Sequence, residues 1–179
     1  MIAKPPATVF RVTRDKYAGT TADALSGNGG LFDNGRWHSQ GRRIIYTSES
    51  TTLCLMERLV HADEWIAERH PDRLMLKIGL PDSISFIRYQ ASDLATQDPF
   101  WRQEGSRLCR ALGDLWLQKC VSCALVVPSA VNPSDSNILL NPLHDDFAAV
   151  LKLNEPLQSE LVDPDERVVL LAKARRFTT

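Results

Sequence analysis

The sequence has no excess of charge of either sign and no long hydrophobic run. Its 21 Lys and Arg residues almost balance its 22 Asp and Glu residues, which leaves a formal net charge of -1. Nonspecific binding to nucleic-acid phosphates requires a clustered basic excess, so we expect no direct contact with DNA. No run approaches the roughly 18 apolar residues that a membrane span requires, and the N-terminal MIAKPPATVF lacks the apolar centre of a signal peptide. We therefore expect a cytoplasmic protein that makes no contact with membranes.

The sequence also has little that could bind a metal. No HExxH or other ligand spacing connects its histidines, which are His38, His61, His70 and His144. Its four cysteines are expected to be reduced thiols in the cytoplasm. Cys120 and Cys123 form a CxxC pair, but the pair joins the end of a helical pattern to an apolar strand, where residues three apart face opposite sides. We therefore predict neither a metal site nor a redox disulfide.

The glycine-rich segment 26–35 does not match a nucleotide-binding loop. Its sequence, SGNGGLFDNG, contains four of the nine glycines and predicts a loop. The spacing of these glycines differs from GxGxxG, and the GK[ST] ending of a Walker loop is missing. Ser129 likewise has no surrounding GxSxG, so we do not expect a hydrolase nucleophile there.

Strands outnumber helices in the hydrophobic pattern, and the two do not alternate regularly. The 179 residues are the size of one domain. Helices are predicted from Ser48 or Ser50 to about residue 69, and over residues 106–119. Strands are predicted over residues 9–12, 43–47, 74–80, 84–88, 124–127, 138–140 and 168–171. Residues 124–127 are apolar throughout and are expected in a buried central strand. This arrangement predicts an α+β fold with a mixed sheet.

Three polar side chains stand where a functional site could form, and each also has an ordinary structural explanation. Arg36 follows Gly35 and could present its planar guanidinium to a carboxylate or phosphate, or stack on Trp37 at the surface. Tyr46 ends an apolar run and is either a packing residue or a platform for a ligand. Glu57 lies at the edge of an apolar stripe, where a carboxylate either reaches solvent or lines a cleft. That predicted stripe consists of Leu53, Met56, Leu59 and Val60.

Several blocks taken together resemble the RES domain family, which is named for its arginine, glutamate and serine. The blocks are FRV at 10–12, GRWHSQGRRIIYTSES at 35–50, LCLMERLVH at 53–61, LPDS at 80–83 and VVPSAVNPSDSNILLNP at 126–142. They follow one another in the family's order. The resemblance predicts a single RES domain over residues 1–179, with a core from about residue 9 to about residue 171.

The resemblance implies the toxin of a bacterial type II toxin–antitoxin pair. Its fold is expected to be similar to that of ADP-ribosyltransferases, with mixed, mostly antiparallel sheets and flanking helices. NAD would be a substrate rather than a bound cofactor, and would be cleaved at the nicotinamide–ribose bond with water or phosphate as the acceptor. The expected partner is a cognate Xre-type antitoxin with a helix-turn-helix domain, in a complex that contains a homo-oligomer of the toxin. The alternatives are a protein mono-ADP-ribosyltransferase and a non-catalytic module that binds the antitoxin.

The family's arginine, glutamate and serine match Arg36, Glu57 and Ser129, and Tyr46 and Arg11 match an active-site tyrosine and an arginine of the first strand. The resemblance implies that the two arginines hold the anionic half of NAD, while the tyrosine ring faces the pyridinium. The glutamate would stabilise positive charge at the reacting ribose carbon. The serine would hydrogen-bond to the ribose or to the nicotinamide amide.

Four further positions follow from the same comparison of blocks. Asn137, in the NILLNP block, is included among the NAD-binding residues. Phe10 stands where relatives carry a tyrosine, so no hydroxyl acts there. Asp165 and Arg167 form a looser version of the family's Asp-Pro-Arg ending, and the sequence assigns them no role.

Overall fold

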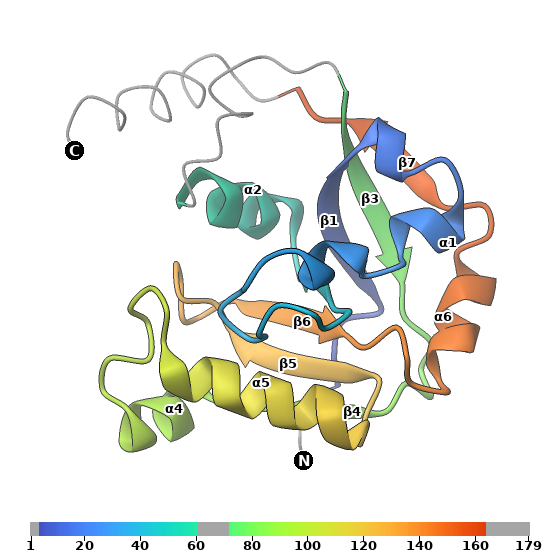
Figure 1. The fold of residues 1–179 in the computed structure, drawn as a ribbon. Helices are drawn as coiled ribbons and strands as arrows, with labels where there is room; N and C mark the ends of the chain where they lie inside the picture. Colours follow the sequence, from blue (N-terminus) through green and yellow to red (C-terminus); the bar gives the residue numbers. More distant parts are fainter. Residues whose placement is uncertain (1–3, 61–71, 164–179) are drawn as a thin grey trace.

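The computed structural model describes residues 4–60 and 72–163 of the chain, which are built around one seven-stranded sheet (Figure 1). The strand order is β4-β5-β6-β2-β1-β3-β7, and every pair is antiparallel except β4 and β5. The strands are β1 (Thr8–Arg14), β2 (Ile45–Ser48), β3 (Arg73–Gly79), β4 (Phe86–Arg88), β5 (Ala124–Pro128), β6 (Ser136–Leu140) and β7 (Gln158–Leu161). The helices are α1 (Thr21–Ala24), α2 (Thr51–Val60), α4 (Ala91–Gln97), α5 (Arg107–Lys119) and α6 (Phe147–Leu153). The predicted α+β class is confirmed.

Some elements differ from the prediction. The predicted strand at 168–171 and the part of the first predicted helix beyond Val60 lie outside the described residues. Sequence patterns missed β7, α1, α4 and α6. All four residues of β7 are exposed, and α4 buries only Leu94, so neither element carries the apolar periodicity on which prediction depends.

The central strand β5 is apolar at every position because both of its faces are buried. Ala124 and Val126 pack into one hydrophobic core, which α1 and α6 also enter, whereas Leu125 and Val127 pack into a second core beside α5. Successive side chains of a strand point to opposite faces, so a strand between two cores has no polar side. The prediction of a buried strand here is confirmed.

The sheet separates into two parts between β1 and β2. These two strands share the single register pair Phe10 and Ser48, whereas β1 pairs with β3 along all seven of its residues and β2 pairs with β6 along all four of its own. Beyond that one pair the strands diverge. The divergence leaves room for a cavity lined by residues of β1, β2, β6 and α2. Helix α2 lies beside these strands (Figure 1).

Helix α2 packs on the sheet through a different face from the one predicted. Leu53 and Cys54 are 2% and 7% exposed, whereas Met56 and Val60 are 43% and 40% exposed. Cys54 packs with residues of β1 and β3, so the buried face is centred between positions 53 and 54. At about 100° per residue, Glu57 then lies at the middle of this inward face and not at its edge.

Helix α5 approaches the segment that contains Trp37 more closely than a side chain would permit. Its buried residues are Cys109, Gly113 and Trp116, while Leu115 is 51% exposed. A Cβ atom at Gly113 would lie 1.9 Å from the Trp37 carbonyl oxygen. Only glycine therefore lets this helix reach the backbone beside Arg36.

Gly113→Ala is expected to destabilise the fold by about 3 kcal/mol or more, because the helix must move away from backbone atoms that cannot yield. Thermal unfolding measures the change, which corresponds to a fall in Tm of roughly 10 °C for a domain of this size. Gly29→Ala is the control, since no atom lies within 4 Å of a Cβ there. Equal melting temperatures for Gly113→Ala and the unmodified protein would contradict the close contact.

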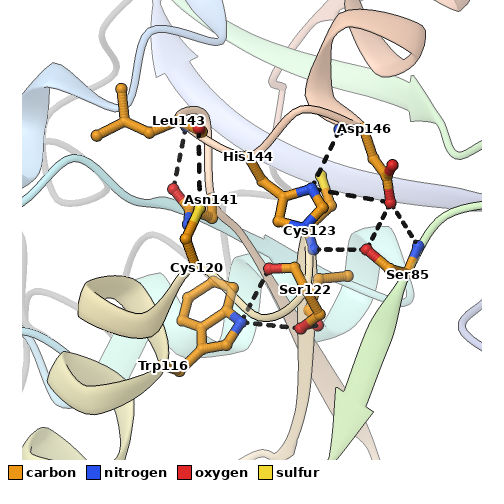
Figure 2. Close-up of polar contacts among 10 residues, drawn as sticks. Ser85, Trp116, Cys120, Ser122, Cys123, Asn141, Leu143, His144 and Asp146 are labelled. Carbon is orange, nitrogen blue, oxygen red and sulfur yellow. Dashed lines mark hydrogen bonds and ion pairs between the residues drawn. The ribbon is translucent and has the colours of Figure 1, made fainter.

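A group of polar contacts joins the loop after β6 to the start of β5 (Figure 2). The Asp146 carboxylate accepts hydrogen bonds from the Ser85 amide and hydroxyl, and these bonds lower the pKa of Asp146. The Ser85 hydroxyl accepts the Cys123 amide, and His144 Nδ1 accepts the Asp146 amide at 3.1 Å. The serine therefore donates to the aspartate and not to the histidine, so this group ties loops together and does not form a catalytic triad.

The cysteines in the described residues are free thiols. Burial raises the pKa of Cys123 to about 12, which keeps this thiol protonated and unreactive. No helix within residues 4–60 and 72–163 is long and apolar enough to span a membrane.

Candidate active site

A cavity of about 350 Å³ lies where β1 and β2 diverge. Strand β1 contributes Arg11, β2 contributes Tyr46 and Ser48, and α2 contributes Glu57. Among the residues proposed from the sequence, five line the cavity: Arg11, Arg36, Tyr46, Glu57 and Asn137. Ser129 is completely buried and contacts Glu57 directly. The structure thus gathers the six predicted residues in one place.

The carboxylate of Glu57 is held through one of its oxygens. Oε1 accepts a hydrogen bond of 2.7 Å from the Ser129 hydroxyl and one of 2.6 Å from Asn137 Nδ2. Within the described part of the chain, no protein donor contacts Oε2. Two donors on one oxygen fix the orientation of the carboxylate and leave its second oxygen available to a ligand.

The hydroxyl of Ser129 is fully occupied by protein groups. It donates to Glu57 and accepts hydrogen bonds from the amides of Val131, at 3.0 Å, and Asn132, at 3.1 Å. A hydroxyl has one hydrogen to donate and two lone pairs, so no capacity remains for a ligand in this arrangement. Ser129 therefore orients Glu57, and the predicted contact with the ribose or amide would require one of these bonds to break.

Asn137 and Ser48 support Glu57 from the sheet. The two residues are register partners on β6 and β2, and the Ser48 hydroxyl donates to Asn137 Oδ1 at 2.7 Å. This bond fixes the amide so that its nitrogen points at Glu57. The sequence did not identify Ser48 as a site residue, although its position two residues after Tyr46 places both side chains on the same face of the strand.

Tyr46 lines the cavity, and its hydroxyl is hydrogen-bonded to protein groups. The hydroxyl accepts the Trp37 amide at 3.1 Å and lies 2.8 Å from His38 Nδ1. Burial raises the pKa of Tyr46 and lowers the pKa of His38, so both groups are neutral at physiological pH. The aromatic wall of the cavity therefore carries no charge of its own. His38 also lines the cavity, and the sequence did not identify it as a site residue.

The segment that contains Arg36 is fixed on α5. Asp114 accepts a hydrogen bond of 2.8 Å from the Ser39 amide and forms an ion pair of 2.9 Å with Arg42 Nε. Arg110 donates to the Gly35 carbonyl at 3.4 Å. Together with the close contact at Gly113, these interactions place Arg36 beside the cavity.

The guanidinium of Arg36 is bound to a loop of the protein. Nη1 donates to the carbonyl oxygens of Trp101 at 3.0 Å and Gln103 at 2.8 Å, and Nη2 donates to that of Arg102 at 3.1 Å. Three of its five N–H donors are used in this way, which leaves two for any ligand. Trp101, the anchor of this loop, is buried in the core beside α5.

Arg11 and Arg58 give one side of the cavity a positive charge. Burial, followed by repulsion from Arg58, lowers the pKa of Arg11 to about 10, which still leaves Arg11 protonated at neutral pH. Arg11 Nη1 is buried, and no acceptor among the described residues contacts it. A buried, unsatisfied cationic donor is costly unless an anion pairs with it. The predicted role of Arg11 in holding an anion is compatible with this position, and Arg58 is a residue that the sequence did not identify.

Of the other positions named from the sequence, Phe10 is described by the structure and lies apart from these contacts. Phe10 is half-buried and packs against the cluster of Val12, Cys54 and Met75 between the sheet and α2. Asp165 and Arg167 lie outside the described residues.

Comparisons with known proteins agree with this fold. The model of the RES domain matches residues 8–169. A protein named Toxin Res from Pseudomonas putida is 37% identical over 145 residues, which cover 80% of this chain and 92% of that protein. A Prs ADP-ribosylating toxin from Sphingobium sp. is 31% identical over 133 residues, which cover 72% of this chain and 79% of that protein.

A solved structure has the same fold at low sequence identity. A chain from the crystal structure of the M. tuberculosis MbcT–MbcA toxin–antitoxin complex superposes with a TM-score of 0.59 at 19% identity. The match covers 93% of this chain and 88% of that chain. The chain therefore belongs to the RES domain family and has the ADP-ribosyltransferase-like fold that its sequence predicted.

Proposed function

We propose that this chain is a toxin that depletes NAD by cleaving the bond between nicotinamide and ribose. The observation that carries the proposal is the environment of Glu57, whose carboxylate lines the cavity and is held through Oε1 alone. The relatives named as Res toxins support the toxin role.

Cleavage of the nicotinamide–ribose bond requires a negative group that stabilises positive charge on the ribose. When the C–N bond breaks, the electron pair leaves with nicotinamide, the pyridinium loses its charge, and positive charge develops on the ribose. A preoriented carboxylate beside that carbon stabilises the charge as carboxylates do at glycosidic centres. With water as the acceptor, the products are nicotinamide, ADP-ribose and one proton. With phosphate, the products are nicotinamide and a phosphorylated ADP-ribose.

The cavity provides suitable surroundings for the rest of the substrate. Its volume of about 350 Å³ lies at the lower end of the range for small-molecule pockets, which suits the nicotinamide–ribose half of a dinucleotide. The neutral ring of Tyr46 can face the cationic pyridinium, an interaction worth about 0.5 to 2 kcal/mol. Arg11 and Arg58 can face the pyrophosphate, which would satisfy the unpaired Arg11 donor.

A protein ADP-ribosyltransferase is the second candidate, because one relative carries the name Prs ADP-ribosylating toxin. The same carbon is attacked in both reactions, and only the acceptor differs. A non-catalytic module that binds an antitoxin is the third candidate, and for it the arrangement around Glu57 would have no chemical purpose.

Incubation of the purified protein with NAD distinguishes these functions. We expect nicotinamide to be released with water or phosphate as the acceptor, and the reaction with and without phosphate identifies which. Transfer of ADP-ribose to a protein in a cell extract would favour the second candidate. No loss of NAD under any of these conditions would leave the binding module.

An antitoxin partner belongs to the same proposal, since the structural neighbour comes from a toxin–antitoxin complex. The expected partner is an Xre-type protein with a helix-turn-helix domain, and the toxin is expected to be oligomeric in the complex. Co-expression of the two proteins, followed by light scattering of the purified complex, measures both the association and its stoichiometry.

A further inference from the structure

The loop between α4 and α5 connects Arg36 with the turn that follows β5. Arg36 holds the carbonyl oxygens of residues 101–103, and the side chain of Arg102 extends from the middle of that segment. Arg102 Nε donates to the Ala130 carbonyl at 2.9 Å, and Nη2 donates to the Val131 carbonyl at 3.4 Å. The guanidinium of Arg102 thus contacts two successive peptide units, 130–131 and 131–132, in the turn that follows Ser129.

These two peptide units are the ones that hold Ser129. The Ala130 carbonyl shares a peptide plane with the Val131 amide, and the Val131 carbonyl shares a plane with the Asn132 amide. Both amides donate to the Ser129 hydroxyl, which donates to Glu57. In a trans peptide the C=O and N–H groups point in opposite directions, so a cation on the two oxygens aims the two N–H groups at the serine.

We infer that Arg102 is a positioning residue for Glu57 and that Arg36 acts on Glu57 through it. The connection runs from Arg36 to the carbonyls of residues 101–103, then through the Arg102 side chain to the peptides after Ser129. The charge of Arg102 also polarises those peptides, which makes their amides better donors and strengthens the chain of hydrogen bonds that ends on the carboxylate. The inference rests on the proposed function, because it gives Arg102 a role in orienting the group that acts on NAD.

A double-mutant cycle tests the connection. Arg102→Ala is expected to lower kcat for NAD cleavage about 10²-fold, equivalent to its two charge-assisted hydrogen bonds, with little change in KM. In a Ser129→Ala background the same substitution should cause no further loss, because the serine through which it acts is absent. Arg107→Ala is the control, since Arg107 is exposed and lies at the start of α5. The same factor in both backgrounds would overturn the inference.

Amide hydrogen exchange provides a measurement that does not depend on activity. Arg102→Ala and Arg36→Ala are both expected to accelerate exchange of the Val131 and Asn132 amides, while Arg107→Ala leaves their rates unchanged. Arg36 has no direct contact with those amides, so its effect can reach them only through the loop. Unchanged exchange in both variants would refute the connection even if NAD is cleaved. Faster exchange in a protein that does not cleave NAD would retain the connection and reject the proposed function.

Discussion

Replacement of Glu57 with glutamine is expected to reduce NAD cleavage by at least about 10³-fold while the fold remains intact. The amide oxygen of glutamine can take the place of Oε1 and accept the same hydrogen bonds from Ser129 and Asn137. The amide nitrogen then occupies the position of Oε2. The substitution therefore preserves volume and support but removes the negative charge that stabilises the transition state. Initial rates of nicotinamide release at saturating NAD measure the loss.

Glu49→Gln is a matched control for this experiment. Glu49 lies just before α2, and its carboxylate accepts the Ser136 amide at 2.9 Å, a bond that a glutamine oxygen can also accept. It follows Ser48, which lines the cavity, but does not line the cavity itself, so this variant should cleave NAD at close to the normal rate. Thermal unfolding of both variants establishes that they are folded. A Glu57→Gln protein that melts normally and remains fully active would show that the carboxylate has no part in the reaction.

The position of Glu57 shows where sequence reasoning about this fold succeeded and where it failed. The hydrophobic pattern predicted a helix over this segment and placed Glu57 near its apolar face. The pattern predicted that Met56 and Val60 are buried, because both are large and apolar, and did not predict that Cys54 is buried. In the structure Cys54 is buried and the other two are exposed, since a small thiol fits where the helix approaches β1 and β3. With this different buried face, Glu57 lies at the centre of the face that packs on the sheet and not at its edge.

The residues of the site were predictable as a set because they lie in recognisable blocks, but their contacts were not. Arg36 and Ser129 were expected to contact NAD. In the structure, three of the five N–H donors of Arg36 and the whole hydrogen-bonding capacity of the Ser129 hydroxyl are used by protein groups. The donors and acceptors that these groups use are distant in sequence; Trp101, for example, is 65 positions from Arg36. No local pattern encodes such partners.

Arg102 illustrates the same limit. It lies in an exposed loop without periodicity, and nothing in its neighbours indicates that its side chain reaches the turn after β5. The contact forms because β5 lies next to the core that holds Trp101, so the loop and the turn meet at one end of that strand. Only the packing of two distant segments brings the residue into the site.

Arg36→Lys is expected to reduce kcat for NAD cleavage about 10²-fold. A lysine ammonium is a point charge on a flexible stem and cannot hold three carbonyl oxygens in the geometry of a planar guanidinium. The loop that carries Arg102 would then shift. Displacement of a supporting segment by about 1 Å can cost a factor of this size. Steady-state kinetics measure the change, together with thermal unfolding, which should show a loss of about 1 to 3 kcal/mol from the missing hydrogen bonds.

Arg43→Lys is the control, because Arg43 is exposed seven positions along the same segment and should tolerate the exchange. The division of the Arg36 effect between kcat and KM then separates two roles. A guanidinium that works by holding the loop changes kcat, because the carboxylate is misplaced while the substrate still binds. A guanidinium that binds the pyrophosphate with its two remaining donors raises KM instead. Near-normal values of both constants in Arg36→Lys would remove Arg36 from the site, since neither role survives the loss of its planar geometry.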